Sequence, residues 1–332
     1  MNILVTGAAG YIGSICSEVL LDRGHQVVAL DNLQEGHLAA VPPRAIFCHA
    51  DLAVRDQIEQ VFAKYRFDAV MHFAGEALVA KSVREPSTFY AANIACGVNL
   101  LDSMTRHGVK KFIFSSTAAT YGEPRTVPIP ENHSQEPINP YGKSKLRFEQ
   151  ILSDYRAYTG LDYAVLRYFN AAGASAERGE HHRVETHLIP RVLDAATAAI
   201  PQVEVFGTDY PTPDGTCVRD YIHVLDIADS HVRALESLDR ISGEAFNVGT
   251  SRGFSILEVL DAAERVTGRK IPRKLSPRRA GDPAVLVASR EKLRSALGWE
   301  AQHSSLEEII SSAWLWKQKH PHGYVEGASV SR

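Results

Sequence analysis

The sequence predicts an α/β fold, with a Rossmann-type, doubly wound parallel sheet and a smaller α/β lobe. The chain opens on a strand, a glycine-rich turn, a helix and a second strand. Apolar strands then alternate with amphipathic helices over 45–168, and this alternation stops near residue 170. A length of 332 residues also suggests two lobes. We expect residues 1–170, with a return segment of about 217–245, to form the first lobe and residues 171–332 the second.

A glycine-rich turn follows the first expected strand, Asn2–Thr6. Glycines here allow a sharp turn, a close approach of the backbone to a pyrophosphate and tight packing of the next helix on the sheet. That helix should end at Gly24, and the free N–H groups at its amino terminus favour an anion. The residues predicted to hold the phosphates of a dinucleotide are Gly7, Gly10, Tyr11, Ile12 and Gly13.

The second expected strand, Gln26–Leu30, places Asp31 at its carboxyl end and Asn32 beside it. A carboxylate at this point can bind both ribose hydroxyls and would repel a 2′-phosphate, so we expect NAD rather than NADP. The glycines alone would also fit a purely structural turn. The strand before them, the helix after them and the acidic residue favour dinucleotide binding.

Small and polar residues follow the next expected strands, at 45–48, 69–73, 111–115 and 163–167. Ligands of such sheets gather where the carboxyl ends of parallel strands meet. We expect Asp51 to reach the adenine amino group. The residues predicted to contact NAD along this rim are Asp51, Leu52, Phe73, Ala74, Gly75, Ser115 and Tyr168.

A tyrosine and a lysine share one face of a helix that Asn139 should cap and Gly160 should end. They are Tyr141 and Lys145, four residues apart. The charges of Lys145 and of an oxidised nicotinamide would lower the pKa of Tyr141 from about 10 towards neutrality, which would make it a general base. Thr117, at the end of the fifth strand, can direct its hydroxyl to the same substrate oxygen. The structural alternative is that Tyr141 only anchors the helix.

The glycine turn, the Tyr141-to-Lys145 spacing and the hydroxyl of Thr117 resemble the extended short-chain dehydrogenase/reductase superfamily. Within it, the chain resembles the UDP-glucose 4-epimerases over nearly its whole length. The segments that carry this closer resemblance are 73–75, 168–170, the loop 206–224 and 277–282. The resemblance implies that the first lobe binds NAD and the second a UDP-sugar. It also implies reversible inversion of carbon 4 of a UDP-hexose through a transient 4-keto sugar.

The resemblance implies roles for individual residues. Thr117 and Tyr141 would act on the sugar 4-hydroxyl, Lys145 would hold the nicotinamide ribose, and Asn93 would support the site. The residues that would bind the UDP-sugar are Thr117, Asn170, Leu188, Phe206, Arg219, Tyr221, Arg279, Asp282 and Val285. The two arginines would bind the diphosphate, because a guanidinium pairs with two phosphate oxygens at once.

The resemblance further implies a homodimer. Two helices, expected at 87–107 and 140–158, would pair with their copies as a four-helix bundle.

The chain departs from some members of the family at two positions. Glu76 and Ala77 follow the 73–75 segment where some members carry a lysine near the cofactor. That contact is therefore missing or is supplied by Lys81. Val285 stands where some members carry a bulky tyrosine near the 2-substituent of the sugar. The smaller side chain predicts that N-acetylated sugars are also accepted.

Other functions would require other residues or would not require these. A nucleotide-sugar 4,6-dehydratase would place Asp-Glu after Thr117, where this chain has Ala118 and Ala119. An epimerase or decarboxylase acting on a UDP-pentose or UDP-uronate remains open. A non-catalytic, NAD-sensing regulator would not need Thr117, Tyr141 and Lys145 together.

Composition argues against other partners and compartments. A formal charge of -3 does not favour nucleic acid. No apolar stretch approaches the roughly 20 residues of a membrane span, and no signal peptide is recognisable. The four cysteines, Cys16, Cys48, Cys96 and Cys217, lack metal-ligand spacing and favour a reducing cytoplasm.

The remaining polar segments suggest no further ligand. We expect no metal site, because His181 and His182 are adjacent in a polar loop and should be solvated. His223 and Asp226 should form a structural hydrogen bond. The stretch 207–224 should be a long binding loop and the basic stretch 269–279 a solvated face, and the tail 327–332 should have no fixed structure.

Overall fold

The computed structural model describes residues 1–279, 281–303 and 305–325. The tail 327–332 lies outside this range. Within the described residues, no helix is both long enough and apolar enough to cross a membrane.

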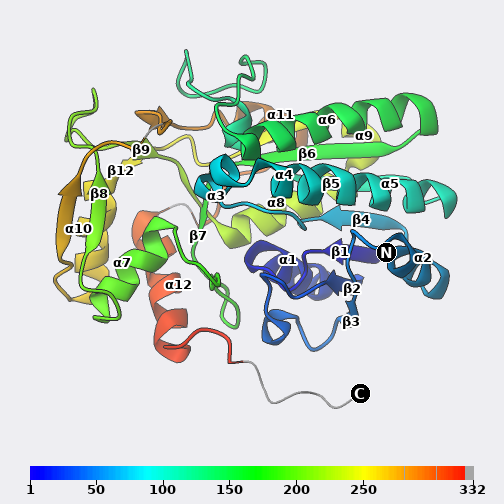
Figure 1. Ribbon diagram of the computed structural model, residues 1–332, viewed down its shortest axis with the longest axis horizontal. Coiled ribbons are helices and arrows are strands. Elements are labelled where there is room, and N and C mark those ends of the chain that lie inside the picture. Colours follow the sequence, from blue (N-terminus) through cyan, green and yellow to red (C-terminus); the bar gives the residue numbers. More distant parts are fainter. Residues whose placement is uncertain (280, 304, 326–332) are drawn as a thin grey trace.

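A parallel sheet of seven strands forms the centre of the larger lobe, in the order β11-β6-β5-β4-β1-β2-β3 (Figure 1). These strands are β1 (Asn2–Thr6), β2 (Gln26–Asp31), β3 (Ile46–His49), β4 (Ala69–His72), β5 (Lys111–Thr117), β6 (Asp162–Tyr168) and β11 (Glu244–Val248). After β1 the chain adds β2 and β3 on one side, and it then adds β4, β5 and β6 on the other side. The order of the strands therefore switches between β1 and β4. In doubly wound folds, a crevice at the carboxyl ends of such neighbouring strands is the place where ligands bind. The predicted fold class is confirmed.

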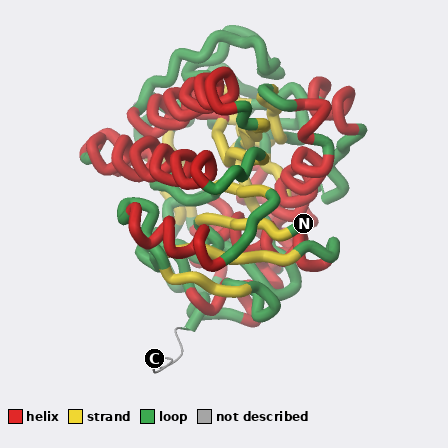
Figure 2. The backbone as a smooth tube through the Cα atoms, turned by 90° about the vertical axis from the view of Figure 1, so that its right-hand side faces the viewer, coloured by secondary structure: helices red, strands yellow, loops and turns green. Residues whose placement is uncertain are grey.

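Helices cover both faces of this sheet, as the two views in Figures 1 and 2 show. Ile3 and Val5 of β1 belong to a core shared with one layer of helices, whereas Leu4 points to the core on the other face. The first layer consists of α1 (Tyr11–Asp22), α8 (Val224–Glu236), α9 (Leu238–Ile241) and α11 (Glu291–Leu297), and the second of α2 (Arg55–Lys64), α5 (Cys96–Arg106) and α6 (Pro140–Thr159).

Local sequence signals predicted the ends of most helices and strands of the larger lobe to within one or two residues of their observed positions. Asn139 caps α6 by accepting a hydrogen bond from the N–H of Gly142 at 2.9 Å, and Gly160 ends the helix in a left-handed conformation, as predicted. Two expectations need correction: the segment up to Thr117 belongs to β5, and Tyr168 belongs to β6, instead of following these strands. Pairing between β5 and β6 continues to Thr117 opposite Tyr168, which keeps both strands extended.

The smaller lobe is built from short strands and three longer helices. Its elements are β8 (Val203–Phe206) paired with β13 (Arg273–Ser276), a sheet of β12 (Phe254–Ser255), β9 (Val218–Arg219) and β14 (Val285–Leu286), and the helices α7 (Leu188–Ala196), α10 (Ile256–Thr267) and α12 (Leu306–Lys319). The stretch 207–224 is not irregular throughout, because its second half contains β9 and β10 (Tyr221–His223). β10 pairs with β7 (Asn170–Ala172). Residues 224–248 return to the larger lobe as α8, α9 and β11, and the exact domain boundaries stay a prediction.

Candidate active site

The glycine turn lies directly against the chain that leaves β4. Gly7 has a positive φ of 70°, and a Cβ on it would stand 2.5 Å from the backbone nitrogen of Ala74. A Cβ on Gly13 would stand 2.2 Å from the carbonyl oxygen of Gly7. Only glycines fit these two positions, so the backbone forms an open cradle at the amino terminus of α1. A dinucleotide pyrophosphate fits this cradle.

Asp31 closes one side of the cradle. Its carboxylate accepts hydrogen bonds from the backbone N–H of Ala9 at 2.9 Å and of Leu33 at 2.8 Å. Burial raises the pKa of Asp31, and these two hydrogen bonds oppose that rise. Asn32 donates to the carboxylate of Asp51 at 3.2 Å, so the predicted ribose and adenine contacts lie side by side.

Asn93 links the cofactor rim to the catalytic helix. Its side-chain amide donates to the carbonyl of Glu76 at 3.0 Å and to the hydroxyl of Ser144 at 2.9 Å, and its oxygen accepts from the N–H of Glu76 at 2.8 Å. A Cβ on Gly75 would meet Asn93 Oδ1 at 2.5 Å and would lie 3.7 Å from Lys145 Nζ. The backbone at 75–76 is therefore fixed next to Lys145. Asn93 itself lies in a π-helical turn, Ala91–Ala95, between α4 (Pro86–Tyr90) and α5.

Lys81, the proposed substitute for a missing cofactor contact, is already paired. Its ammonium lies 3.0 Å from the carboxylate of Glu76, and the hydrogen bond to this carboxylate raises the pKa of Lys81. Lys81 is on α3 (Val79–Arg84). Glu76 thus holds this lysine near the rim and offsets its charge.

Thr117 and Tyr141 are brought together at the end of β5. The Thr117 hydroxyl hydrogen-bonds to the Tyr141 phenol, and it also accepts from the N–H of Ala119 at 3.1 Å. Burial nevertheless raises the pKa of Tyr141, with the hydrogen bond from Thr117 acting in the opposite direction. The expectation that Lys145 lowers the pKa of Tyr141 is therefore not met by the protein alone. The positive charge of an oxidised nicotinamide would have to supply that effect.

Lys145 is almost fully buried, with 5% of its surface exposed. Its ammonium donates to the carbonyl of Ser115 at 3.1 Å and lies 4.9 Å from the centre of the Phe114 ring. Burial lowers the pKa of Lys145 to about 8, while the charge of Glu149 opposes this shift. Next to it, the hydroxyls of Ser115 and Tyr168 hydrogen-bond to each other.

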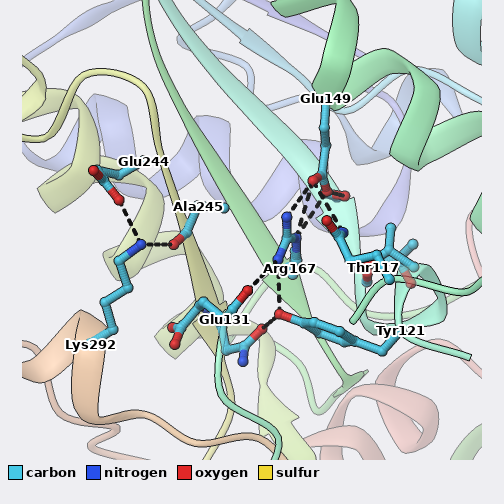
Figure 3. A network of polar contacts seen from close by, with 12 residues as sticks. Thr117, Tyr121, Glu131, Glu149, Arg167, Glu244, Ala245 and Lys292 are labelled. Atoms are coloured by element: carbon cyan, nitrogen blue, oxygen red, sulfur yellow. Dashed lines mark hydrogen bonds and ion pairs between the residues drawn. The ribbon is translucent and has the colours of Figure 1, made fainter. Parts of the chain in front are cut away.

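A buried polar network lies behind Thr117 (Figure 3). The guanidinium of Arg167 pairs with the carboxylate of Glu149 at 2.5 Å and donates to the hydroxyl of Tyr121 at 2.9 Å. Ser116, the neighbour of Thr117, donates to Glu149 at 2.5 Å, and Tyr121 donates to Asn247 at 2.7 Å. Our sequence reasoning missed this network, although a charged residue in the apolar strand 163–167 was a usable signal.

Four residues predicted to bind the UDP-sugar form one group in the smaller lobe. Arg219 and Asp282 form an ion pair with each other. The guanidinium of Arg279 lies 3.9 Å from the centre of the Phe206 ring, a cation–π contact. Tyr210 donates its hydroxyl to the carbonyl of Asp282 at 3.3 Å. Two arginines and an aromatic ring at one place suit a nucleoside diphosphate.

The other predicted substrate residues lie at strand and helix ends. Asn170 and Tyr221 are register partners in the β7–β10 pair. Val285 pairs with Val218, so it lies one step along β9 from Arg219. Leu188 is the first residue of α7.

Two expectations about histidines need correction. His181 is only partly solvated, since it is half-buried and its ring stacks on that of His37 at 4.5 Å. His223 does not bond Asp226: its imidazole interacts with the Ser312 hydroxyl at 2.9 Å, and Asp226 accepts from the N–H groups of Gln302 and His303 instead. The basic side chains of the stretch 269–279 are exposed, as expected, and several of them pair with acidic residues, as in Lys270–Glu264, Lys274–Glu204 and Arg278–Asp209.

His182 is also not simply solvated. It belongs to a cluster with Glu180, Glu185 and His187, which our sequence reasoning missed. The signal was present in the sequence, where Glu180 and Glu185 alternate with His182 and His187.

Comparison with known proteins assigns the family. The model of the NAD dependent epimerase/dehydratase family matches residues 3–249. The chain belongs to this family. Among its relatives, the UDP-glucose 4-epimerase of Lacticaseibacillus casei is 47% identical over 98% of this chain and 99% of the relative. The UDP-glucose 4-epimerase of Streptococcus mutans is 49% identical over 98% of this chain and 99% of the relative.

Solved structures of the family agree with this fold. The crystal structure of UDP-glucose 4-epimerase from Brucella ovis in complex with NAD is 45% identical, with a TM-score of 0.91 over 94% of this chain and 97% of that one. NAD is the cofactor of this family.

Proposed function

We propose that this chain is a UDP-hexose 4-epimerase, which interconverts UDP-galactose and UDP-glucose by inverting carbon 4. The pairing of the Tyr141 phenol with the Thr117 hydroxyl, beside the NAD-binding cradle, carries the proposal. Names of relatives with nearly full coverage support it. The cradle of Gly7 and Gly13 and the carboxylate of Asp31 would hold NAD, which would supply reversible hydride transfer at carbon 4, from one face of the sugar and back to the other.

Tyr141 takes the proton of the sugar 4-hydroxyl in the first half of the cycle and returns it in the second. Thr117 hydrogen-bonds both to this phenol and to the reacting oxygen, so it keeps the proton path aligned. Lys145 binds the nicotinamide ribose while it stays anchored to the carbonyl of Ser115. Burial raises the pKa of Tyr141, and the positive charge of an oxidised nicotinamide would act in the opposite direction.

The hexose ring of the keto sugar must rotate between the two halves of the cycle. The enzyme therefore has to hold this intermediate by its nucleotide. Arg219 and Arg279 pair with the diphosphate, and Phe206 packs beside it. In this arrangement Asp282 holds Arg219 until substrate arrives. Tight binding of UDP and weak binding of the hexose would allow either face of carbon 4 to point towards the nicotinamide.

The first test is to incubate the purified protein with UDP-galactose, without added NAD, and to resolve the products by proton NMR. Formation of UDP-glucose would support both the reaction and a retained cofactor. Formation only after NAD is added would indicate a loosely held cofactor. If the sugar remains unchanged in both cases, UDP-pentoses and UDP-uronates are tested next. Tight NAD binding without turnover of any UDP-sugar would favour the regulator instead.

We further infer a homodimer that forms through α5 and α6. The predicted helix at 87–107 is continuous from Pro86 to Arg106 through α4, the π-helical turn and α5. Large aromatic side chains are exposed here, at Tyr90 (39%) and Tyr158 (87%). A mass of twice the chain's 36.5 kDa in light scattering would support the dimer, and a monomer mass would refute it.

A cytoplasmic location is also part of the proposal. All four cysteines are free thiols, which is typical of a reducing compartment.

A further inference from the structure

Four metal-binding side chains converge in the loop that leads into α7. They are Glu180, His182, Glu185 and His187, hereafter the His–Glu cluster, and one ligand atom of each lies within 4.8 Å of the other three. His182 Nδ1 is 3.0 Å from a carboxylate oxygen of Glu185 and 3.5 Å from one of Glu180. His187 Nδ1 is 2.5 Å from the same carboxylate of Glu180. All four groups thus face a common centre.

The surroundings of the cluster suit a cation at that centre. The side chains of Glu180 and Glu185 are only 6% and 17% exposed, so two carboxylates are held together away from bulk water. With neutral imidazoles the cluster would carry a charge of about −2, which is costly to bury unless it is paired or coordinates a metal. A divalent ion would neutralise it completely.

We propose that the His–Glu cluster is a binding site for a divalent transition metal of the zinc type. Two imidazole nitrogens and two carboxylate oxygens form a complete tetrahedral ligand set for Zn²⁺. Ligand atoms around zinc lie about 3.3 Å from one another, and the observed separations require only small side-chain movements. Mg²⁺ and Ca²⁺ are disfavoured, because they prefer oxygen ligands in sets of six or more.

The location of the cluster indicates what the metal would do. The ring of His182 meets the ring of Tyr11 edge-on at 6.4 Å, and Tyr11 belongs to the NAD-binding turn. His187 is the residue that precedes α7, whose first residue, Leu188, is a predicted substrate contact. A bound ion would therefore fasten the loop before α7 in place beside the cofactor turn. Its role would be to stabilise the junction of the two ligand sites.

The proposal is tested by metal content and by cobalt spectroscopy on the whole protein. We expect about one zinc per chain after purification without chelators. After removal of zinc with a chelator, Co²⁺ should produce the visible bands of a four-coordinate ion, and added Zn²⁺ should displace it. The melting temperature should fall on chelation and recover with Zn²⁺. These readouts need no turnover, so they remain informative even if the proposed epimerase reaction is wrong.

Variants identify the ligands. His182→Gln and Glu185→Gln should each weaken Co²⁺ binding by about 100-fold or more, because each removes one ligand. His303→Gln is the matched control: His303 also pairs with a glutamate, Glu308, at 2.6 Å, but it lies outside the cluster. This control should bind Co²⁺ like the wild type.

Two results would overturn the proposal. The first is a folded wild-type protein that shows no Co²⁺ bands and no bound zinc, in which case protons on the histidines balance the two glutamates. The second is metal content that both cluster variants retain in full, which would place the ion elsewhere.

Discussion

Glu149 and Arg167 form a buried ion pair, with 2.5 Å between their charged atoms and less than a tenth of either side chain exposed. Glu149 is on α6, the helix of Tyr141 and Lys145, and Arg167 is on β6. Ser116 of β5 donates to the same carboxylate. The pair therefore fastens the catalytic helix to the two strands beside it, and it sets the position of Tyr141 relative to Thr117.

We predict that Glu149→Gln destabilises the protein by about 3–5 kcal/mol, because it leaves the charge of Arg167 buried without a partner. Urea unfolding measures this as a lower midpoint. The control is Glu136→Gln, which breaks the exposed pair of Glu136 with Arg125 and should cost at most about 1 kcal/mol. Equal losses in the two variants would show that the buried pair does not fasten α6.

Tyr141→Phe should lower turnover of UDP-galactose by about 100- to 10,000-fold, because it removes the general base while keeping the ring. Thr117→Val should also slow the reaction, since the hydroxyl that pairs with Tyr141 is lost. Thr117→Ser keeps this hydroxyl and is the matched control. Calorimetric titration with UDP should give roughly unchanged affinities for all three variants. Near wild-type turnover in Tyr141→Phe would remove Tyr141 from its assigned role.

Stability should fall as the pH drops from 6.5 towards 4, and His231 should contribute to this fall. Burial lowers the pKa of His231 to about 4, with the hydrogen bond to the Ile227 carbonyl opposing the shift. In this window the unfolded chain binds a proton that the folded chain does not, so stability is lost as the pH falls. His231→Phe should reduce the slope of unfolding free energy against pH by up to about 1.4 kcal/mol per unit. An unchanged slope would show that His231 does not titrate in this way.

Much of the larger lobe was predictable because its signals are local. The glycines from Gly7 to Gly13, the carboxylate of Asp31 and the cap of α6 at Asn139 each act within a few residues of the backbone that they shape. Such signals are visible in any short window of sequence.

The features that the sequence did not predict depend on contacts between residues that are far apart in the chain. Glu149 and Arg167 meet only after α6 packs on β6, and Asp226 binds the N–H groups of Gln302 and His303, far along the chain. No periodic pattern marks such partners. The His–Glu cluster is short in sequence, but the closeness of its ligand atoms depends on the conformation of a loop that has no periodic pattern.

The position of Val285 beside Val218 leads to the last prediction. Val285 is half-buried and pairs with Val218, and the resemblance to the family places it near the 2-substituent of the sugar. A small residue leaves room for a 2-acetamido group, and we predict turnover of UDP-N-acetylgalactosamine as well as UDP-galactose. Val285→Tyr should lower the ratio of the two rates by about tenfold or more, because the larger side chain fills that space. Val285→Ile is the control and should change the ratio only slightly. If the ratio stays constant in both variants, another residue governs access of the acetamido group.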